Sequence, residues 1–131
     1  MNLQLDTHSA LWALNEHRRL SPAARELIAD KANTINVSVA TLWEISIKHP
    51  LDRKGGNAMP ISGSKALELF EEARFRILSV TAAHAVAVEQ LPLIHHDPFD
   101  RLLVAQALTE PLRLVTGDRL LTRYSDTVIL V

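Results

Sequence analysis

Short segments with strand character alternate with helical segments along most of this chain, and this alternation restricts the fold more than any other feature. Residues 34–39 alternate and are rich in β-branched side chains, which predicts a strand. Residues 3–5 and 112–115 are further predicted strands, and apolar residues recur at helical spacing between them. The pattern predicts βαβ units, and hence an α/β fold with a mainly parallel sheet between two layers of helices. A length of 131 residues suits one domain over residues 1–131.

Helix starts are marked by residues that cap free backbone N–H groups. Ser21-Pro22 and Asp97-Pro98 combine a capping side chain with a proline that fits the first helical position, and Thr81 is a further predicted cap. Ala40, Trp43 and Ile47 predict a helix packed on the sheet by that face. Further predictions are helices over residues 8–14 and 62–73, a loop over 50–60, an edge strand or extended link over 75–78, and a last strand over 128–131.

Composition excludes several classes of protein. The chain has no cysteine, which excludes disulfides and thiolate metal sites. It has no apolar run near the roughly 20 residues of a membrane span, and its N-terminus lacks the features of a signal peptide, so we expect a cytoplasmic protein without a membrane partner. The net charge of −1 is unusual for a nucleic-acid binder. If four of the 15 acids held a metal, however, 11 acids would remain against 14 Lys and Arg. The rest of the surface would then be mildly basic and able to bind phosphates.

Two of the predicted strands run into aspartates. Asp6 follows residues 3–5, and Asp118 follows residues 112–115 after a short turn. Ligands of open parallel sheets bind at the carboxyl ends of the strands, so both carboxylates should lie at one rim. Glu44 and Asp100, each near the start of a predicted helix, are placed to reach the same rim.

Each of these acids also has a purely structural interpretation. Asp6, Asp118 and Asp97 can all cap helices, and Asp100 would face the positive end of its helix. Glu44 and Lys48 are an i,i+4 pair worth only a few tenths of a kcal/mol. It is the gathering of at least three carboxylates at one rim that favours a site.

A carboxylate cluster is unstable without a cation. Two carboxylates about 4 Å apart repel by about 4 kcal/mol at an effective dielectric of 20, and a divalent ion removes that penalty. Oxygen ligands favour Mg²⁺ or Mn²⁺ over zinc. Such an ion can hold a phosphate oxygen and activate a bound water, so the natural reaction is hydrolysis of a phosphodiester.

The chain closely resembles the PIN-domain family and, within it, the VapC-like toxins of bacterial toxin–antitoxin pairs. No one motif is decisive, but the matching segments occur in the family's order and cover nearly the whole chain. They are Leu5-Asp6-Thr7-His8 with Leu11-Trp12, then Val37-Ser38 with Leu42-Trp43-Glu44-Ile45 and Lys48, then Asp97-Pro98-Phe99-Asp100-Arg101-Leu102-Leu103-Val104-Ala105-Gln106-Ala107, and finally Leu114-Val115-Thr116-Gly117-Asp118.

The resemblance implies a three-layer α/β/α domain and a Mg²⁺- or Mn²⁺-dependent endoribonuclease. Its acidic quartet would be Asp6, Glu44, Asp100 and Asp118. Asp97 would be an outer ligand or only a helix cap. Family members often cut tRNA or ribosomal RNA, are silenced by an antitoxin whose tail enters the active-site groove, and commonly dimerise, which implies a homodimer and a toxin–antitoxin hetero-oligomer. Thr7 and Thr116 would orient carboxylates or waters, and the candidate substrate-binding cations are Lys48, Arg53, Lys54 and Arg101.

Two other functions remain open at this point. An aspartyl-phosphate phosphohydrolase would want Asp-x-Asp after the first strand, which Asp6-Thr7-His8 lacks. A non-enzymatic PIN-like interaction protein would carry a degenerate site, whereas all four acids are present. The loop over residues 50–60 varies within the family, so the resemblance does not identify the substrate.

Histidines and aromatic residues give weaker indications. His95-His96 has no partner at helical ligand spacing, so zinc is not favoured, and His8 would touch substrate or pack beside Trp12. Trp12 and Trp43 are predicted core residues. Tyr124 and Phe75 are the candidate exposed rings for stacking on bases.

Overall fold

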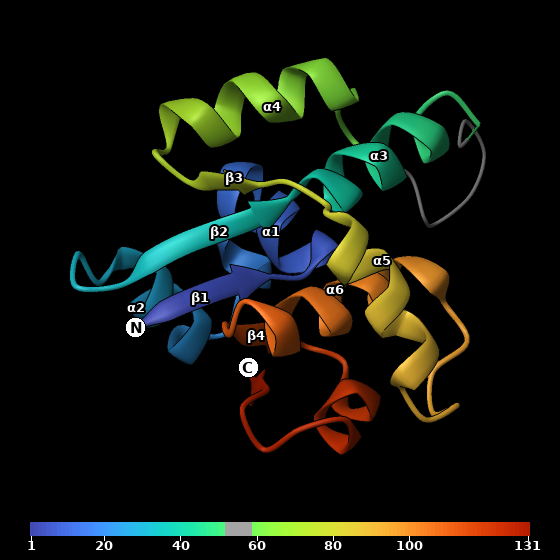
Figure 1. Cartoon of the computed structure of the whole chain (residues 1–131). Coiled ribbons are helices and arrows are strands. Elements are labelled where there is room, and N and C mark those ends of the chain that lie inside the picture. Colours follow the sequence, from blue (N-terminus) through green and yellow to red (C-terminus); the bar gives the residue numbers. More distant parts are fainter. Residues whose placement is uncertain (52–58) are drawn as a thin grey trace.

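Five short parallel strands form the centre of the molecule in the computed structural model, which describes residues 1–51 and 59–131 (Figure 1). The strands are β1 (Asn2–Leu5), β2 (Thr34–Ser38), β3 (Arg76–Leu78), β4 (Arg113–Thr116) and β5 (Ile129–Leu130). The α-helices are α1 (Thr7–Asn15), α2 (Pro22–Ala29), α3 (Val39–Lys48), α4 (Gly63–Glu72), α5 (Ala82–Ala87) and α6 (Pro98–Thr109). Three short 3₁₀ helices are η1 (His17–Arg19), η2 (Val88–Gln90) and η3 (Arg119–Arg123).

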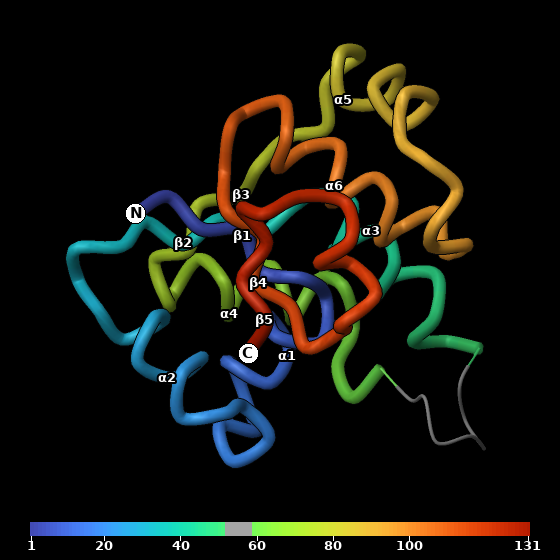
Figure 2. The backbone as a smooth tube through the Cα atoms, turned by 90° about the horizontal axis from the view of Figure 1, so that it is seen from below, coloured from blue at the N-terminus to red at the C-terminus, as the bar shows by residue number. Residues whose placement is uncertain are grey.

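The strand order is β3-β2-β1-β4-β5, and every neighbouring pair is parallel. This confirms the predicted α/β class and places residues 76–78 on an edge strand. Figure 2 shows α1, α2 and α4 on one side of the sheet and α5 and α6 on the other, which gives three layers. The carboxyl ends of β1 and β4 lie side by side, because Leu5 pairs with Val115.

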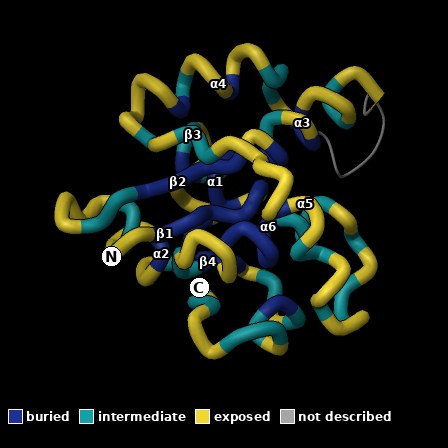
Figure 3. The backbone as a smooth tube through the Cα atoms, viewed as in Figure 1, coloured by how far each residue is buried: buried dark blue, intermediate teal, exposed yellow. Residues whose placement is uncertain are grey.

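The two faces of the sheet bury different side chains. Leu3 and Leu5 of β1 point into a large apolar core together with Phe70 of α4. Gln4, between them, points to the other face, where it is fully buried and donates to Gln106 of α6 at 3.4 Å. The sheet and the inner sides of the helices are therefore buried, while the outer turns of α4 and α5 face solvent (Figure 3).

The predicted helix caps are confirmed by their hydrogen bonds. Ser21 accepts from the Ala24 amide at 3.1 Å, Thr81 accepts from the His84 amide, and Asp97 accepts from the first turn of α6. The second strand ends one residue earlier than predicted. Ser38 caps α3 by accepting from the Ala40 amide, so Val39 begins that helix and is exposed. The short helix η3 was not predicted.

The prediction that α3 packs through Ala40, Trp43 and Ile47 is wrong for two of the three. Trp43 is 58% exposed and Ile47 39%. The helix instead buries Thr41, Glu44 and Ile45, and the two polar residues are tolerated there because they reach Thr7 of α1. None of the helices in the described residues has the length and apolar character that a membrane span requires.

Candidate active site

Asp6 stands at the rim formed by the carboxyl ends of β1 and β4. Its Oδ1 accepts from the Ser9 amide at 2.9 Å and so caps α1. Its Oδ2 accepts from the Thr116 hydroxyl at 2.6 Å, and Thr116 Oγ1 in turn accepts from the Asp118 amide at 3.0 Å. Asp6 is only 7% exposed. The predicted cap is real, and Thr116 joins the two strand-end aspartates.

Glu44 reaches the site from the buried side of α3. The Thr7 hydroxyl donates to Glu44 Oε1 at 2.7 Å and lies 3.1 Å from the Thr41 hydroxyl. The Lys48 ammonium donates to Glu44 Oε2 at 2.6 Å. Burial lowers the pKa of Lys48, but its hydrogen bond to Glu44 and the negative charges of Glu44, Asp97 and Asp100 outweigh burial and raise it overall. Lys48 is therefore a permanent cation at the border of the site.

Asp97 precedes α6, and Asp100 lies in its first turn. Asp97 Oδ1 accepts from the Phe99 amide at 2.8 Å and from the Asp100 amide at 3.3 Å, which makes it the cap of that helix. The Asp100 carboxyl carries no such cap bond. Burial, followed by the charges of Asp97, Asp6 and Glu44, raises the pKa of Asp100 to about 7, against an opposing effect of His95. The structure thus brings these acids within electrostatic range of Asp100.

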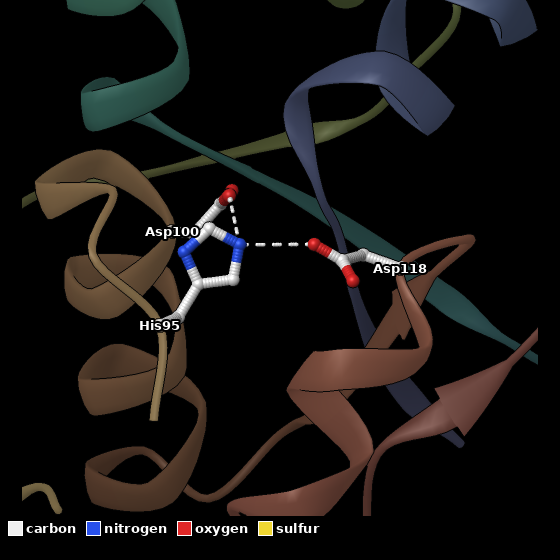
Figure 4. Close-up of side chains that lie close together, drawn as sticks. All are labelled: His95, Asp100 and Asp118. Atoms are coloured by element: carbon white, nitrogen blue, oxygen red, sulfur yellow. Dashed lines mark hydrogen bonds and ion pairs between the residues drawn. The ribbon is translucent and has the colours of Figure 1, made fainter. Parts of the chain in front are cut away.

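Asp118 follows β4 and completes the rim. Its Oδ1 accepts from the Leu120 amide at 2.9 Å and caps η3. Its Oδ2 faces the His95 ring, with Nε2 at 2.9 Å, and the same nitrogen lies 3.4 Å from Asp100 Oδ2 (Figure 4). One atom from each of these three residues lies within 4.8 Å of the others. At that separation two carboxylates repel by about 3.5 kcal/mol at a dielectric of 20.

The donor set fits a hard divalent cation. The acids of the rim offer carboxylate oxygens, which Mg²⁺ and Mn²⁺ prefer. Burial and the neighbouring carboxylates raise the pKa of Asp100 to about 7, so the charged form of Asp100 is disfavoured there. A divalent cation bound by Asp6, Glu44, Asp100 and Asp118 would supply that compensation, so the residues fit the group that the sequence predicts.

The predicted substrate-binding cations are placed differently from one another. Lys48 borders the acids. The Arg101 guanidinium instead donates to the carbonyls of Pro92 and Val88 and to the Tyr124 hydroxyl, at 3.0, 3.3 and 3.2 Å, and so holds a loop. Arg53 and Lys54 lie outside the described residues.

A cavity of about 250 Å³ opens beside the rim. Its lining residues are Asp6, His8, Ser9, Trp12, Gly117 and Asp118. The His8 ring stacks on Trp12 with centroids 5.7 Å apart, so this histidine packs on the tryptophan at the edge of the cavity. The cavity adjoins two of the candidate ligands and is open to a substrate group.

Sequence reasoning missed two side chains at the site. Trp43 was predicted to be core, yet it faces solvent next to Glu44 and packs edge-on against Phe99, with centroids 5.2 Å apart. The expected exposed rings are less free, since Tyr124 accepts two hydrogen bonds and Phe75 packs on Phe70. His95 contacts two candidate ligands. In the sequence, the available indication that His95 belongs to the site was its position two residues before the Asp97 cap.

Comparison with known proteins gives a consistent result. Residues 4–126 match the PIN domain family. Ribonuclease VapC22 of Mycobacterium tuberculosis is 34% identical over 121 residues, covering 92% of this chain and 89% of that protein.

Solved structures resemble the fold. VapBC2 from Rickettsia felis, bound to a DNA fragment from its promoter, matches with a TM-score of 0.70 at 23% identity over 100% of this chain and 98% of its own. DNA-bound VapBC from Salmonella typhimurium matches with a TM-score of 0.66 at 15% identity, covering 100% and 97%. FitAcB from Neisseria gonorrhoeae matches with a TM-score of 0.62 at 17% identity, covering 98% and 96%.

Proposed function

The chain belongs to the PIN-domain family as a VapC-like member, and from that premise we propose that it is a Mg²⁺- or Mn²⁺-dependent endoribonuclease that acts as the toxin of a type II toxin–antitoxin pair. The observation that carries the proposal is that Asp100 and Asp118 offer carboxylate oxygens within 4.8 Å of each other, while Asp6 and Glu44 lie near enough for their charges to act on Asp100, whose pKa is raised to about 7. Without a cation, this arrangement costs stability. A fold that keeps it is therefore best explained by an ion that binds there.

In this proposal Asp6, Asp100 and Asp118 hold the ion, and Glu44 holds or orients the attacking water. The bound ion would polarise the scissile phosphate and lower the pKa of a water. Thr116 and Thr7 fix the carboxylates of Asp6 and Glu44 through the hydrogen bonds described above. Asp6 caps α1 with Oδ1 and accepts from Thr116 with Oδ2, so both of its oxygens are held before any ligand binds. Asp118 caps η3 with Oδ1 only, and its Oδ2 faces His95.

Lys48 and Asp97 take supporting roles. Lys48 keeps its charge and its side chain is 39% exposed, so it is placed to attract an RNA phosphate next to Glu44. Asp97 uses Oδ1 for the cap of α6, which favours the cap over an outer ligand. Arg101 is committed to its loop, and we no longer assign it to the substrate.

The partners follow from the relatives. The mycobacterial relative is named a ribonuclease, and two solved neighbours are VapBC assemblies bound to DNA. We propose an RNA substrate, with tRNA or ribosomal RNA as the first classes to test, in the cytoplasm. A cognate antitoxin, a homodimer and a hetero-oligomer of toxin and antitoxin complete the proposal.

The test is cleavage of total RNA by the purified, antitoxin-free protein. We expect discrete fragments with Mg²⁺ or Mn²⁺, and none with EDTA or with Asp6→Asn. Asp126→Asn, which changes an exposed aspartate, is the matched control and should cleave like the wild type. An active Asp6→Asn protein would refute the assigned role.

Metal-linked stability separates an enzyme from a binding-only protein. A ligand that binds only the folded state stabilises it by RT ln(1 + L/Kd), where L is the free ligand concentration, so the melting temperature rises with the logarithm of that concentration above Kd. We expect Mg²⁺ or Mn²⁺ to raise it in the wild type and not in Asp6→Asn. Equal melting temperatures with and without metal would favour the non-enzymatic alternative.

A further inference from the structure

His95 is held in one orientation by contacts that do not involve the acidic site. Its backbone amide donates to the Tyr124 hydroxyl at 2.8 Å, and Arg101 donates to the same hydroxyl. Its ring nitrogen Nδ1 accepts from the Asp97 amide at 3.0 Å. The loop before α6 and the cap of α6 together therefore aim Nε2 at the rim.

These contacts also determine where the ring proton lies. A backbone amide can only donate, so Nδ1 must present its lone pair to Asp97. In the neutral ring the proton is then on Nε2, which faces Asp118 Oδ2 at 2.9 Å and Asp100 Oδ2 at 3.4 Å. His95 thus donates to Asp118, and Asp100 lies close to the same nitrogen.

The same reasoning argues against His95 as a metal ligand. Coordination through Nε2 needs a lone pair on that atom, which moves the proton to Nδ1. Nδ1–H would then face the Asp97 N–H, donor against donor, and the Asp97 amide would lose its acceptor. The triad of His95, Asp100 and Asp118 is compact enough to suggest a transition-metal site, but its hydrogen bonding opposes one.

The carboxylates of the rim differ in how firmly they are held. Asp6 and Glu44 are 7% and 5% exposed and receive hydroxyl donors from Thr116 and Thr7. The side chains of Asp100 and Asp118 are 22% and 41% exposed. For Asp118 Oδ2, the His95 ring is the donor that the threonine hydroxyls are for the buried pair.

We propose that His95 is a positioning residue of the metal site: its Nε2–H orients Asp118, beside Asp100, for a divalent cation that His95 does not itself bind. The inference rests on the proposed metal-dependent function. Partners of this kind fix the orientation of ligands, and their loss typically weakens metal binding by about 10- to 100-fold.

The test compares His95→Ala with His95→Gln by calorimetric titration of the metal-free protein with Mg²⁺ or Mn²⁺. The glutamine amide nitrogen reaches about as far as Nε2 and can only donate, so it can replace the donor to Asp118. Because the glutamine carbonyl oxygen is itself a possible cation ligand, recovery by His95→Gln is read together with the ring-proton measurement below. We expect His95→Ala to bind about tenfold more weakly and His95→Gln to recover most of the affinity. His96→Ala, at the exposed neighbouring histidine, is the control and should bind like the wild type.

A second readout detects the ring proton directly. Nitrogen NMR of the wild type, with the His95 signals assigned by their loss in His95→Gln, distinguishes Nε2–H from Nδ1–H. We expect Nε2–H both without metal and at saturating Mg²⁺. A switch to Nδ1–H on metal binding, or a loss of Zn²⁺ and Ni²⁺ affinity far larger than that of Mg²⁺ in both variants, would identify His95 as a ligand and overturn the proposal.

Two further results would also overturn it, and they differ in meaning. Unchanged Mg²⁺ affinity in His95→Ala, with only a lower melting temperature, would make the residue purely structural and leave the nuclease proposal intact. A wild-type protein that binds neither Mg²⁺ nor Mn²⁺ would refute the metal-dependent function itself, and the role of His95 with it.

Discussion

Two histidines near the ends of the segment between Thr81 and Asp97 have the same pattern of hydrogen bonds in different surroundings. His84 Nδ1 accepts from the Thr81 amide and His95 Nδ1 from the Asp97 amide, each at 3.0 Å. His84 Nε2 faces the Glu110 carboxylate, and His95 Nε2 faces that of Asp118. In both cases a backbone donor fixes the ring and a carboxylate receives the other nitrogen.

What differs is the neighbourhood of each carboxylate. His84 is 1% exposed and joins α5 to α6 with Gln106 as a further polar partner, so its pair with Glu110 stabilises the packing of two helices. Asp118 is one of several acids at the rim, where burial and the neighbouring carboxylates raise the pKa of Asp100. The comparison shows that the same pattern of hydrogen bonds can stabilise helix packing in one region and orient a carboxylate of the candidate metal site in the other.

The largest effect should come from changing the carboxylate partner of each histidine to its amide. Asp118→Asn removes a charged ligand, and we expect RNA cleavage to fall at least about a thousandfold, equivalent to about 4 kcal/mol, with little loss of stability. Glu110→Gln should leave cleavage unchanged and destabilise the fold by about 1–2 kcal/mol. Cleavage rates and urea unfolding of both variants measure this. Equal effects on cleavage would break the comparison.

The acidic rim should make the metal-free protein sensitive to pH. Because the pKa of Asp100 is raised from 3.8 to about 7 in the folded state, its neutral form is favoured there. The contribution of Asp100 to the free energy of unfolding is therefore fully present below about pH 4 and is lost as the pH rises through about 7. We expect Asp100→Asn to be more stable than the wild type at pH 8 by about 3 kcal/mol, reduced for partial exposure, and equally stable near pH 4.

Saturating Mg²⁺ is the control for this prediction. The ion should restore the stability of the wild type at pH 8 and leave that of Asp100→Asn largely unchanged, because the substitution removes a ligand. Urea unfolding at several pH values, with EDTA or Mg²⁺, gives both comparisons. Parallel pH profiles for the two proteins would contradict the raised pKa of Asp100.

Alanine substitutions of His84 and His95 should differ in how much they lower the free energy of unfolding. His84→Ala removes a fully buried ring and part of the cap of α5, and we expect a loss of about 2 kcal/mol. His95→Ala removes no fully buried ring and should cost less than about 1 kcal/mol in the absence of metal. Thermal unfolding in EDTA measures the difference. A larger loss for His95→Ala would make its role structural.

The smallest effect is expected for Trp43, the exposed aromatic beside the site. Trp43 is 58% exposed and packs edge-on against Phe99, so Trp43→Ala should cost less than about 1 kcal/mol. Trp12→Ala is the matched change, because Trp12 packs against the main core and should cost more. Urea unfolding tests both, and an equal loss would show that Trp43 supports the fold.

Much of the fold could be predicted because its causes are local. The strand over residues 34–38 follows from β-branched alternation, and Ser21, Thr81 and Asp97 cap helices with atoms two or three residues away. The placement of Asp6 and Asp118 at one rim follows from a general rule of parallel sheets rather than from contacts. These features needed no knowledge of which distant segments meet.

The buried face of α3 could not be predicted in the same way. Helical spacing alone makes Ala40, Trp43 and Ile47 the apolar stripe. Glu44 is buried instead because the Thr7 hydroxyl, 37 residues away, donates a hydrogen bond to its carboxylate. A charged side chain can be buried in place of an aromatic one only when another element of the fold provides it with a hydrogen-bond partner.

The sequence by itself determined the alternation of strands and helices, the caps, and the aspartates that follow β1 and β4, because these depend on neighbours along the chain. Only the tertiary structure decided that His95 turns a donor toward Asp118, 23 residues away, and that Arg101 holds a loop. It also set the raised pKa of Asp100, since that shift requires burial and three other carboxylates close by. Electrostatics and hydrogen bonding act through space, and a linear pattern does not contain those distances.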